Sequence, residues 1–534
     1  MTNDKYIPIV VGVTGHRTIR EQDRSALYAA VKHELKKLQE LCPHSPLVLL
    51  CSLAEGGDLL CADAAEDLGI ALIAALPTER EVFVRDLSPA ALERFEHHCA
   101  RAEDLFVIPP TEALPENGPT RAYLFRQAGI YISAHSHVLL ALWDGGEGTQ
   151  AACGTAEAVD FALNGSYRPV RGTPLRSGGN EAVIHVFTPR GEHCEEAAGT
   201  VHVYGRSEAI RDILQKTDDY NRLAGTVEVT DVSRLPESAP DDPVLLRTER
   251  ISLIAGKLSG LYAGKFRRAL ALIAAASAVL TFAFLMYDEA HLVWMIFICG
   301  IMLLTAWQVQ RYASRSDCHR RYIEFRALAE CLRVQTYLRY AGAELCTSEL
   351  LSWSQQTETA WILDALCALE VGCPPKAEHD IRECWVEEQR RYHHAAKKRS
   401  RRSLGVSERV VRFALILSVA LYLAALLFEL LFGRLLFPPI SSLANADLCR
   451  TILKILLGTI SAVTLFTANY YGRLSLPRTL SDHQKMERFY TKMSRQLLER
   501  SQTPELLSVL AREELIENAN WCSYQRDNAP NFNL

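Results

Sequence analysis

The sequence predicts two parts of different fold class. The first is an α/β N-terminal domain built on a parallel sheet, and the second is an all-α C-terminal half with four transmembrane helices and long cytoplasmic helical extensions. Short apolar runs alternate with amphipathic segments over about the first 190 residues, whereas four stretches of about 20 apolar residues lie in the second half. A chain of 534 residues is also too long for one compact domain. We therefore expect a soluble domain joined to a membrane domain.

Strands and helices are expected to alternate along the N-terminal domain. Apolar, β-rich runs of four to eight residues predict strands, and longer segments with apolar residues three or four apart predict helices. Near-continuous apolar strands that alternate with helices indicate a parallel sheet covered on both faces. In such a sheet, ligands bind beyond the carboxyl ends of the strands. The expected strands are 7–13, 46–53, 70–76, 105–108, 138–143 and 181–187, and the expected helices are 21–41, 59–68, 90–102, 120–134 and one from about 155.

Three loops at that edge carry the candidate ligand-binding residues. Glycines let backbone amides approach a ligand, a helix start offers a positive dipole end, and Arg17 supplies a planar fork for phosphate. Together these features predict a phosphorylated, nucleotide-like ligand and no metal. The candidates are Gly12, Thr14, Gly15, His16, Arg17, Ser52, Glu55, Gly56, Asp58, Trp143, Asp144, Gly145, Gly154 and Thr155.

Several of these residues also have an ordinary structural interpretation. The segment 12–17 could be only a tight turn, and Asp58 could cap the next helix or accept a hydrogen bond from a ribose hydroxyl. We expect His16, His135 and His137 to be local hydrogen-bonding groups rather than metal ligands.

The second half contains four expected membrane spans, at about 269–287, 292–309, 413–432 and 452–471. Lysine and arginine residues gather at the ends of the spans that face segment 311–410. The opposite connections, 288–291 and 433–447, contain one arginine, Arg434, and no lysine. The positive-inside rule therefore predicts a multi-pass protein of the cell inner membrane with both termini in the cytoplasm. The alternative is that the four segments are buried core helices. Candidates for a pore-facing side, or else for hydrogen bonds between helices, are Thr459, Ser461, Thr464, Thr467 and Asn469.

Amphipathic helices are expected at 318–340, 384–402 and 481–500, between and after the spans. Their apolar stripes would pack on one another or on a second subunit, which predicts a homo-oligomer. The segment 164–264 reads as the end of the sheet followed by a linker. The expected divisions are a ligand-sensing domain (1–200), a linker and connecting helix (201–265), a first transmembrane hairpin (266–310), a cytoplasmic helical region (311–410), a second hairpin (411–472) and C-terminal cytoplasmic helices (473–534).

Composition narrows the possible function. Hydrophobic residues make up 49% and charged residues 23% of the chain, which excludes a disordered protein. The formal net charge of -5 argues against binding to a nucleic acid polymer. Fifteen cysteines without a Cys-x-x-Cys pair indicate free thiols in a reducing compartment. The N-terminus has no basic region followed by an apolar stretch, so we expect no signal peptide.

At the three loops, over about residues 5–190, the sequence resembles the SLOG superfamily. This Rossmann-like group includes DNA-processing protein A and the cytokinin-activating lysine-decarboxylase-like proteins. The whole chain looks like bacterial members in which a SLOG sensor is joined to a four-helix membrane effector. That resemblance implies antiviral defence. The sensor would bind a cyclic nucleotide or an ADP-ribose-type signal made by a separate enzyme, with no cofactor, and the membrane part would then permeabilise the lipid bilayer.

The hydrolytic relatives carry a Gly-Gly-x-Gly-Thr-x-x-Glu motif whose glutamate assists cleavage of an N-glycosidic bond. Gly145-Gly146-Glu147-Gly148-Thr149 fits the first part, but Ala152 stands at the position of the glutamate. In the other register, Glu157 follows Gly154-Thr155 one residue early. This departure favours a sensor without catalytic residues over an enzyme. The alternatives are a membrane-anchored nucleotide N-glycosidic hydrolase and a scaffold with a vestigial pocket.

Overall fold

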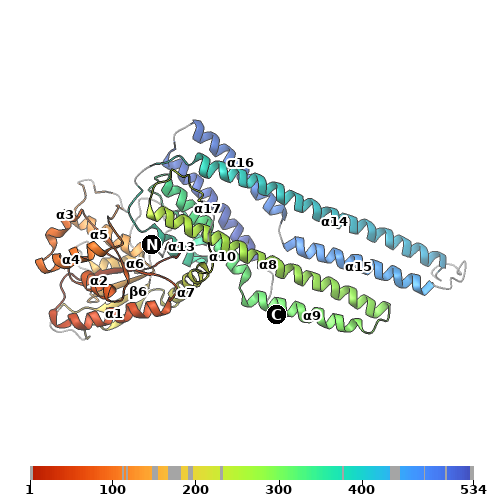
Figure 1. Ribbon diagram of the computed structural model, residues 1–534, viewed down its shortest axis with the longest axis horizontal. Helices are drawn as coiled ribbons and strands as arrows, with labels where there is room; N and C mark the ends of the chain where they lie inside the picture. The colour runs from red at the N-terminus through yellow and green to blue at the C-terminus, as the bar shows by residue number, and fades with distance from the viewer. Residues whose placement is uncertain are drawn as a thin grey trace. The chain divides into compact units, whose positions relative to one another are not determined.

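The computed structural model describes most of the chain (Figure 1). Its described residues fall into two compact units, and each unit is considered by itself. Unit 1 comprises Met1–Leu258, Glu324–Ile381 and Gln502–Asn520, and unit 2 comprises Ser259–Ile323, Arg382–Ser501 and Trp521–Leu534. Within these ranges the described residues are 4–110, 114–115, 118–146, 154–165, 182–190, 196–228, 233–375, 378–432, 446–473, 476–499 and 502–528.

Unit 1 is built on a seven-stranded sheet with the strand order β4-β3-β2-β1-β5-β6-β7. All neighbouring strands are parallel except β7, which pairs antiparallel with β6. The expected parallel sheet is therefore confirmed, and the arrangement is Rossmann-like. The strands are β1 (Ile9–Gly15), β2 (Leu47–Cys51), β3 (Ala71–Leu76), β4 (Asp104–Val107), β5 (Val138–Trp143), β6 (Ala182–Phe187) and β7 (Val201–Tyr204).

Helices cover both faces of this sheet. One face of α1 carries Leu27, Val31 and Leu35 at helical spacing, and all three are fully buried. This apolar face packs against the sheet. The opposite core gathers Val10, Leu139 and residues of α5 and α6. Figure 1 labels the α-helices around the sheet, and two short 3₁₀-helices, η1 and η2, also belong to this part of the chain. They are η1 (Glu21–Asp23), α1 (Arg24–Leu41), α2 (Gly57–Asp67), α3 (Arg80–Phe83), η2 (Val84–Asp86), α4 (Pro89–Arg101), α5 (Arg121–Ala134) and α6 (Thr155–Asn164).

The sheet and its cover continue beyond residue 200. Strand β7 adds to the edge of the sheet, and the following helix α7 (Ser207–Ala224) packs against β6 and α13. Asn221 on α7 accepts a hydrogen bond from the Ile7 amide at 2.9 Å and donates one to the Ile7 carbonyl at 2.8 Å. This part of the expected linker is therefore integrated into unit 1. The remaining short helices of the unit are α11 (Thr347–Leu350), α12 (Trp353–Glu358) and α13 (Ala360–Glu370).

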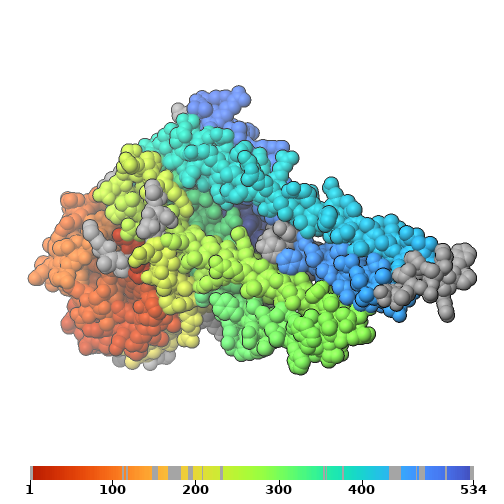
Figure 2. Space-filling view, turned by 45° about the vertical axis from the view of Figure 1, so that its right-hand side comes forward, coloured from red at the N-terminus to blue at the C-terminus, as the bar shows by residue number. Residues whose placement is uncertain are grey.

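Unit 2 is made of long helices. Helix α14 packs along α15 and α16, and Figures 1 and 2 both show α14 and α15 side by side. Three helices, α8, α10 and α17, contribute residues to both units. The helices are α8 (Pro243–Glu289), α9 (Met295–Arg315), α10 (Cys318–Tyr340), the π-helical η3 (Arg382–Glu387), α14 (Glu388–Phe432), α15 (Ala446–Arg473), α16 (Leu476–Glu499) and α17 (Pro504–Asp527).

Within the described residues, two helices rather than four are long and apolar enough to cross a membrane. These are Pro243–Glu289 and Arg382–Leu431, with a mean hydropathy of 2.4 in their most apolar windows. The second and fourth expected spans do form helices, α9 and α15, but among the described residues neither satisfies the same test of length and composition. In α9, the polar residues Gln308, Gln310 and Arg311 in the second half of the helix lower its mean hydropathy.

Candidate ligand-binding site

A pocket of about 630 Å³ opens in unit 1 beyond the carboxyl end of β1; the loop after β2 and helices α5 and α6 line it, and the neighbouring strands β1 and β5 both contribute residues. The strand order reverses between these two strands, since β2 lies on one side of β1 and β5 on the other. Loops diverge at such a point and leave a crevice, which is where α/β sheets bind ligands. The structure brings eight of the expected residues to this pocket, namely Thr14, Gly15, His16, Arg17, Ser52, Asp58, Gly154 and Thr155.

Glycines allow the first two loops to approach each other closely. A Cβ atom on Gly15 would lie 2.9 Å from the Gly57 Cα atom, and one on Gly56 would lie 2.3 Å from the carbonyl oxygens of both His16 and Arg17. Gly56 also has φ +95°, a conformation that L side chains rarely adopt. The Gly57 amide then donates a hydrogen bond to the His16 carbonyl at 2.9 Å. These glycines therefore shape the pocket wall, which a sequence motif alone does not show.

Four arginines, Arg17, Arg121, Arg126 and Arg190, line the pocket. The guanidinium groups of Arg17 and Arg121 lie over the Phe125 ring, at 4.7 and 5.4 Å from its centroid. Arg121 is also paired with Asp86 at 2.5 Å. Arg17 is exposed, and within the described part of the chain no carboxylate forms an ion pair with it. Its charge is therefore available to an anionic ligand.

Arg126 and Glu157 form an ion pair inside the pocket lining. The Arg126 guanidinium also lies 4.7 Å from the centroid of the Phe161 ring, so both its face and its edge are engaged. Glu157 belongs to the first turn of α6, whose N-cap is Gly154 without a side-chain cap. The first amides of a helix have no acceptor within the helix, and its dipole is positive there. The start of α6 can therefore receive an anion.

His16 links the first loop to the loops after β5 and β6. Its Nδ1 atom lies 2.7 Å from an Arg190 guanidinium nitrogen, and its Nε2 atom lies 3.1 Å from the Asp144 amide nitrogen and 3.2 Å from the Asp144 carboxylate. His16 thus contacts Arg190 and both the backbone and the side chain of Asp144. Burial, with the charge of Arg190, lowers the pKa of His16, which favours the neutral ring. His16 therefore connects Arg190 to Asp144 as a hydrogen-bonding group in the pocket wall.

Asp58 is a buried carboxyl group in the pocket wall. Burial raises its pKa to about 7, although the Ala54 amide and the Arg17 charge both favour the ionised form. The carboxylate accepts a hydrogen bond from the Ala54 amide at 3.2 Å, inside its own loop. Asp58 is thus the second residue of α2 and does not cap it, since Gly56 occupies the N-cap position. A strongly shifted carboxyl in a crevice is typical of functional sites.

The other expected residues lie beside the pocket or support it. Glu55 accepts hydrogen bonds from the Ser88 amide and hydroxyl, at 3.2 and 2.6 Å, and lines a neighbouring pocket with Gly56 and Arg17. Gly12 lies inside β1, where a Cβ atom would collide with the Ser136 hydroxyl. Ser52 lines the pocket, yet its hydroxyl donates to the Ala75 carbonyl at 2.9 Å. Trp143 is the last residue of β5, Asp144 and Gly145 follow it, and none of the three lines the pocket.

Sequence reasoning missed the contributions of Arg121, Phe125, Arg126 and Arg190. Arg121 and Phe125 are four residues apart on α5 and therefore share one face of that helix, which is the one signal that could have indicated them. No local pattern relates α5 to the loop after β1, because the two are more than 100 residues apart.

The expected pore residues lie on α15 in unit 2. The hydroxyls of Thr459, Ser461, Thr464 and Thr467 each donate to the carbonyl four residues earlier in the same helix. Thr467 is buried and Ser461 is exposed, so these hydroxyls do not share one environment. Asn469 belongs to the helix, but its side chain lies outside the described residues.

The site therefore combines an exposed arginine, a free helix start and a carboxyl that titrates near neutrality, in a crevice large enough for a nucleotide-sized molecule. Its chemistry suits recognition of an anion with several hydrogen-bonding groups. Comparison of the chain with models of known protein families found no match, and comparison with curated proteins found none either.

Proposed function

We propose that the protein is a membrane-bound effector whose pocket in unit 1 recognises a small nucleotide- or NAD-derived signal. The observation that carries this proposal is the set of four arginines around the pocket, with Arg17 free of any carboxylate ion pair in the described residues. Arginine binds phosphate through two parallel hydrogen bonds, and amides at a helix start add further donors. A phosphate between Arg17 and the start of α6 would use both.

Exposed apolar surface on unit 2 supports contact with a lipid bilayer. Phe413, Leu415 and Ile416 on α14 are more than 60% exposed, and Phe297 on α9 is 72% exposed. Soluble monomers rarely leave large contiguous apolar patches in water. Exposed apolar side chains also lie on α8 and α15, so we propose that all four helices enter the membrane, α9 and α15 included. They include Leu272, Phe284, Ile301, Leu303, Val419, Leu423, Leu427, Ile452 and Leu456.

Ion pairs connect these helices at the ends opposite to the basic clusters. Glu429 at the end of α14 accepts two hydrogen bonds from Arg450 near the start of α15, at 2.6 and 3.0 Å. Glu289 at the end of α8 pairs with Lys454 on α15 at 2.9 Å. Paired charges are less costly near hydrocarbon than single ones. This arrangement supports two hairpins with the basic clusters on the cytoplasmic side, and hence a multi-pass inner-membrane protein with cytoplasmic termini.

The ligand would act through helices that belong to both units. Because α8, α10 and α17 each contribute residues to unit 1 and unit 2, a change in one unit can bias the other. A ligand shifts such an equilibrium only when it binds one state better than the other. In line with the SLOG resemblance, we propose that a separate enzyme makes the signal during viral infection, and that a homo-oligomer then permeabilises the membrane.

The decisive experiment measures binding and membrane leakage with the same protein. Full-length protein in dye-loaded vesicles is mixed with ADP-ribose, with cyclic nucleotides and with inorganic phosphate. We expect one nucleotide to raise the thermal unfolding temperature and to release dye, while phosphate alone does neither. Stabilisation without dye release would support ligand binding by the pocket and would contradict membrane permeabilisation. No stabilisation by any nucleotide in this panel would contradict the proposed ligand class.

Membrane topology is tested separately by cysteine labelling. A cysteine introduced at His291, between α8 and α9, should react with an impermeant maleimide added outside spheroplasts. A cysteine at Arg315, after α9, should react only after the membrane is opened. Reaction at both positions in intact spheroplasts would contradict a membrane-spanning hairpin. Existing cysteines in the segment, Cys299 and Cys318, are buried and provide the background measurement.

A second function, N-glycosidic hydrolysis of a nucleotide, is favoured by two acidic groups in the pocket. Glu157 and Asp58 both line it, and Asp58 can donate or accept a proton near pH 7. Incubation with nucleoside monophosphates should release free base if the protein is a hydrolase, and Glu157→Gln should abolish that release. A sensor would release none.

A further inference from the structure

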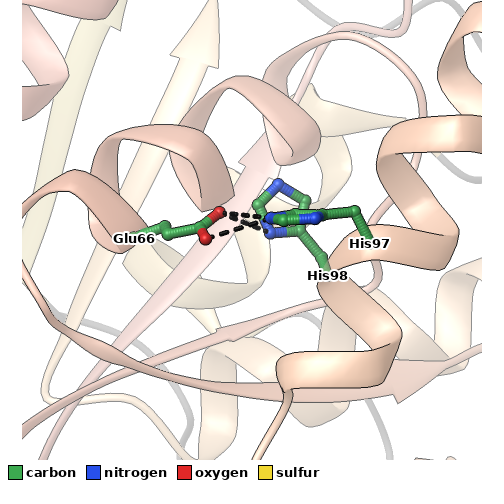
Figure 3. Close-up of side chains that lie close together, drawn as sticks. All are labelled: Glu66, His97 and His98. Atoms are coloured by element: carbon green, nitrogen blue, oxygen red, sulfur yellow. Dashed lines mark hydrogen bonds and ion pairs between the residues drawn. The ribbon is translucent and has the colours of Figure 1, made fainter.

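A cluster of two histidines and a glutamate lies away from the ligand pocket on helices α2 and α4. His97 and His98 of α4 both point toward the Glu66 carboxylate of α2 (Figure 3). The His97 Nε2 atom lies 2.9 Å from Glu66, and the His98 Nδ1 atom lies 3.7 Å from it. One ligand atom from each residue falls within 4.8 Å of the others. Because the two helices pack together, the cluster is part of the fold and not a chance meeting of mobile side chains.

His98 stands between two carboxylates. Its Nε2 atom lies 2.8 Å from Asp63, while its Nδ1 atom faces Glu66. A neutral imidazole carries one proton, so with Nε2–H donated to Asp63 the Nδ1 lone pair would face the lone pairs of Glu66. A cation between Nδ1 and Glu66 removes this repulsion, and so does a second proton on His98. The first arrangement is the carboxylate–histidine–metal pattern of many metal sites.

We propose that Glu66, His97 and His98 bind a divalent transition-metal ion, for which zinc is the best match. Two imidazole nitrogens and one carboxylate oxygen are a zinc-type ligand set, whereas magnesium and calcium prefer oxygen alone. Bonds of about 2.1 Å in a tetrahedral site place neighbouring ligand atoms about 3.4 Å apart. The Glu66 Oε2 atom lies 2.9 Å from His97 Nε2 and 3.7 Å from His98 Nδ1, on either side of that value. Small side-chain movements would therefore bring these distances to those of a zinc site.

The surroundings match a bound cation with one open position. The His98 side chain is 3% exposed, while those of Glu66 and His97 are 32% and 51% exposed, so an ion has a route from solvent. Asp63 provides the outer carboxylate, since it lies 2.8 Å from the His98 Nε2 atom and also pairs with Arg94. Arg101 donates to the Glu66 Oε1 atom at 3.0 Å, which leaves Oε2 for the metal. Such an ion would tie α2, which carries Asp58, to α4.

The test uses tag-free full-length protein, because a histidine tag would bind zinc itself. The protein in detergent is stripped with a chelator and titrated with Zn²⁺ by isothermal calorimetry, and retained zinc is counted by mass spectrometry after dialysis. We expect the wild type to retain one Zn²⁺ per chain more than His97→Ala. The affinity for Zn²⁺ should be at least ten-fold weaker in His97→Ala and in Glu66→Gln than in the wild type. Both replaced side chains are partly exposed, so these variants keep the core intact.

A matched control removes a histidine from a comparable pair elsewhere. His202 pairs with Glu196 at 2.5 Å on a half-exposed surface, and His202→Ala should bind zinc as the wild type does. Zn²⁺ should also raise the unfolding temperature of the wild type and of His202→Ala, but not that of His97→Ala. Equal zinc content and equal affinity in the wild type and His97→Ala would overturn the proposal.

Discussion

The Arg17 guanidinium lies 4.7 Å from the centroid of the Phe125 ring, and it joins the loop after β1 to helix α5 across the mouth of the pocket. Stacking on an aromatic face holds a guanidinium in place while its edge remains free to donate hydrogen bonds. Phe125 is shared with Arg121, so one ring orients two cations. The pocket therefore presents a preorganised positive edge to any ligand that enters.

Replacing Arg17 should weaken binding of a phosphorylated ligand. Hydrogen bonds to charged groups contribute about 1.5–3 kcal/mol, so Arg17→Ala should reduce affinity about ten-fold to a hundred-fold. Isothermal calorimetry with the nucleotide that stabilises the wild type measures the effect. Arg222→Ala is the control, because Arg222 forms a surface pair with Asp219 on α7. Equal affinity in Arg17→Ala and the wild type would show that Arg17 does not touch the ligand.

Alanine at Gly56 should destabilise the protein more than alanine at Gly69. Both glycines have positive φ, but a Cβ atom on Gly56 would lie 2.3 Å from two carbonyl oxygens, whereas Gly69 faces open space. Backbone strain alone costs about 1–3 kcal/mol, and only Gly56→Ala adds a collision. The unfolding temperature of Gly56→Ala should therefore be well below that of Gly69→Ala. Equal unfolding temperatures would mean that the two loops can separate at no cost.

The stability of unit 1 should depend on pH through Asp58. Its pKa is about 7 when folded and about 4 in an unfolded chain, so the folded state binds the extra proton between these values. The stabilisation of the folded state by the protonated Asp58 carboxyl is fully present below pH 4, and it is lost as the pH rises toward 7 and beyond. Asp58→Asn should therefore gain stability relative to the wild type between pH 5 and pH 8.

Thermal unfolding at several pH values measures this difference. Asp67→Asn on the same helix is the control, because hydrogen bonds from Lys32 and Tyr28 lower the pKa of Asp67 and keep it ionised throughout this range. A gap between Asp58→Asn and the wild type that does not change with pH would contradict the raised pKa of Asp58.

A larger side chain at Gly458 should disturb the packing of α15 against α8. A Cβ atom there would lie 2.5 Å from the Leu285 side chain, so α8 and α15 approach each other closely at this point. We expect Gly458→Leu to lower the unfolding temperature in nanodiscs, since overpacking costs about 1–3 kcal/mol. Gly300→Leu on α9, where nothing lies within 4 Å, should have little effect. Recovery in the double variant Gly458→Leu/Leu285→Ala would confirm that these two side chains collide.

Local patterns predicted the elements well. The expected strand at 138–143 and the expected helix at 318–340 match β5 and α10 in their bounds, and the other N-terminal strands lie within two or three residues of those expected. Apolar periodicity reports which face of a segment is buried, and this is a local property. Helix α7 was missed because the segment 164–264 mixes polar and proline-rich stretches with short periodic ones.

The sequence by itself determined the parallel sheet, the edge at which its loops meet, and the apolar helices of the second half. All of these depend on residues close together in the chain. Only the tertiary structure decided that Arg121, Phe125 and Arg190 join Arg17, and that His97 and His98 meet Glu66, about 31 residues away. Such meetings depend on strand order and on helix packing over the sheet, and short-range periodicity does not encode them.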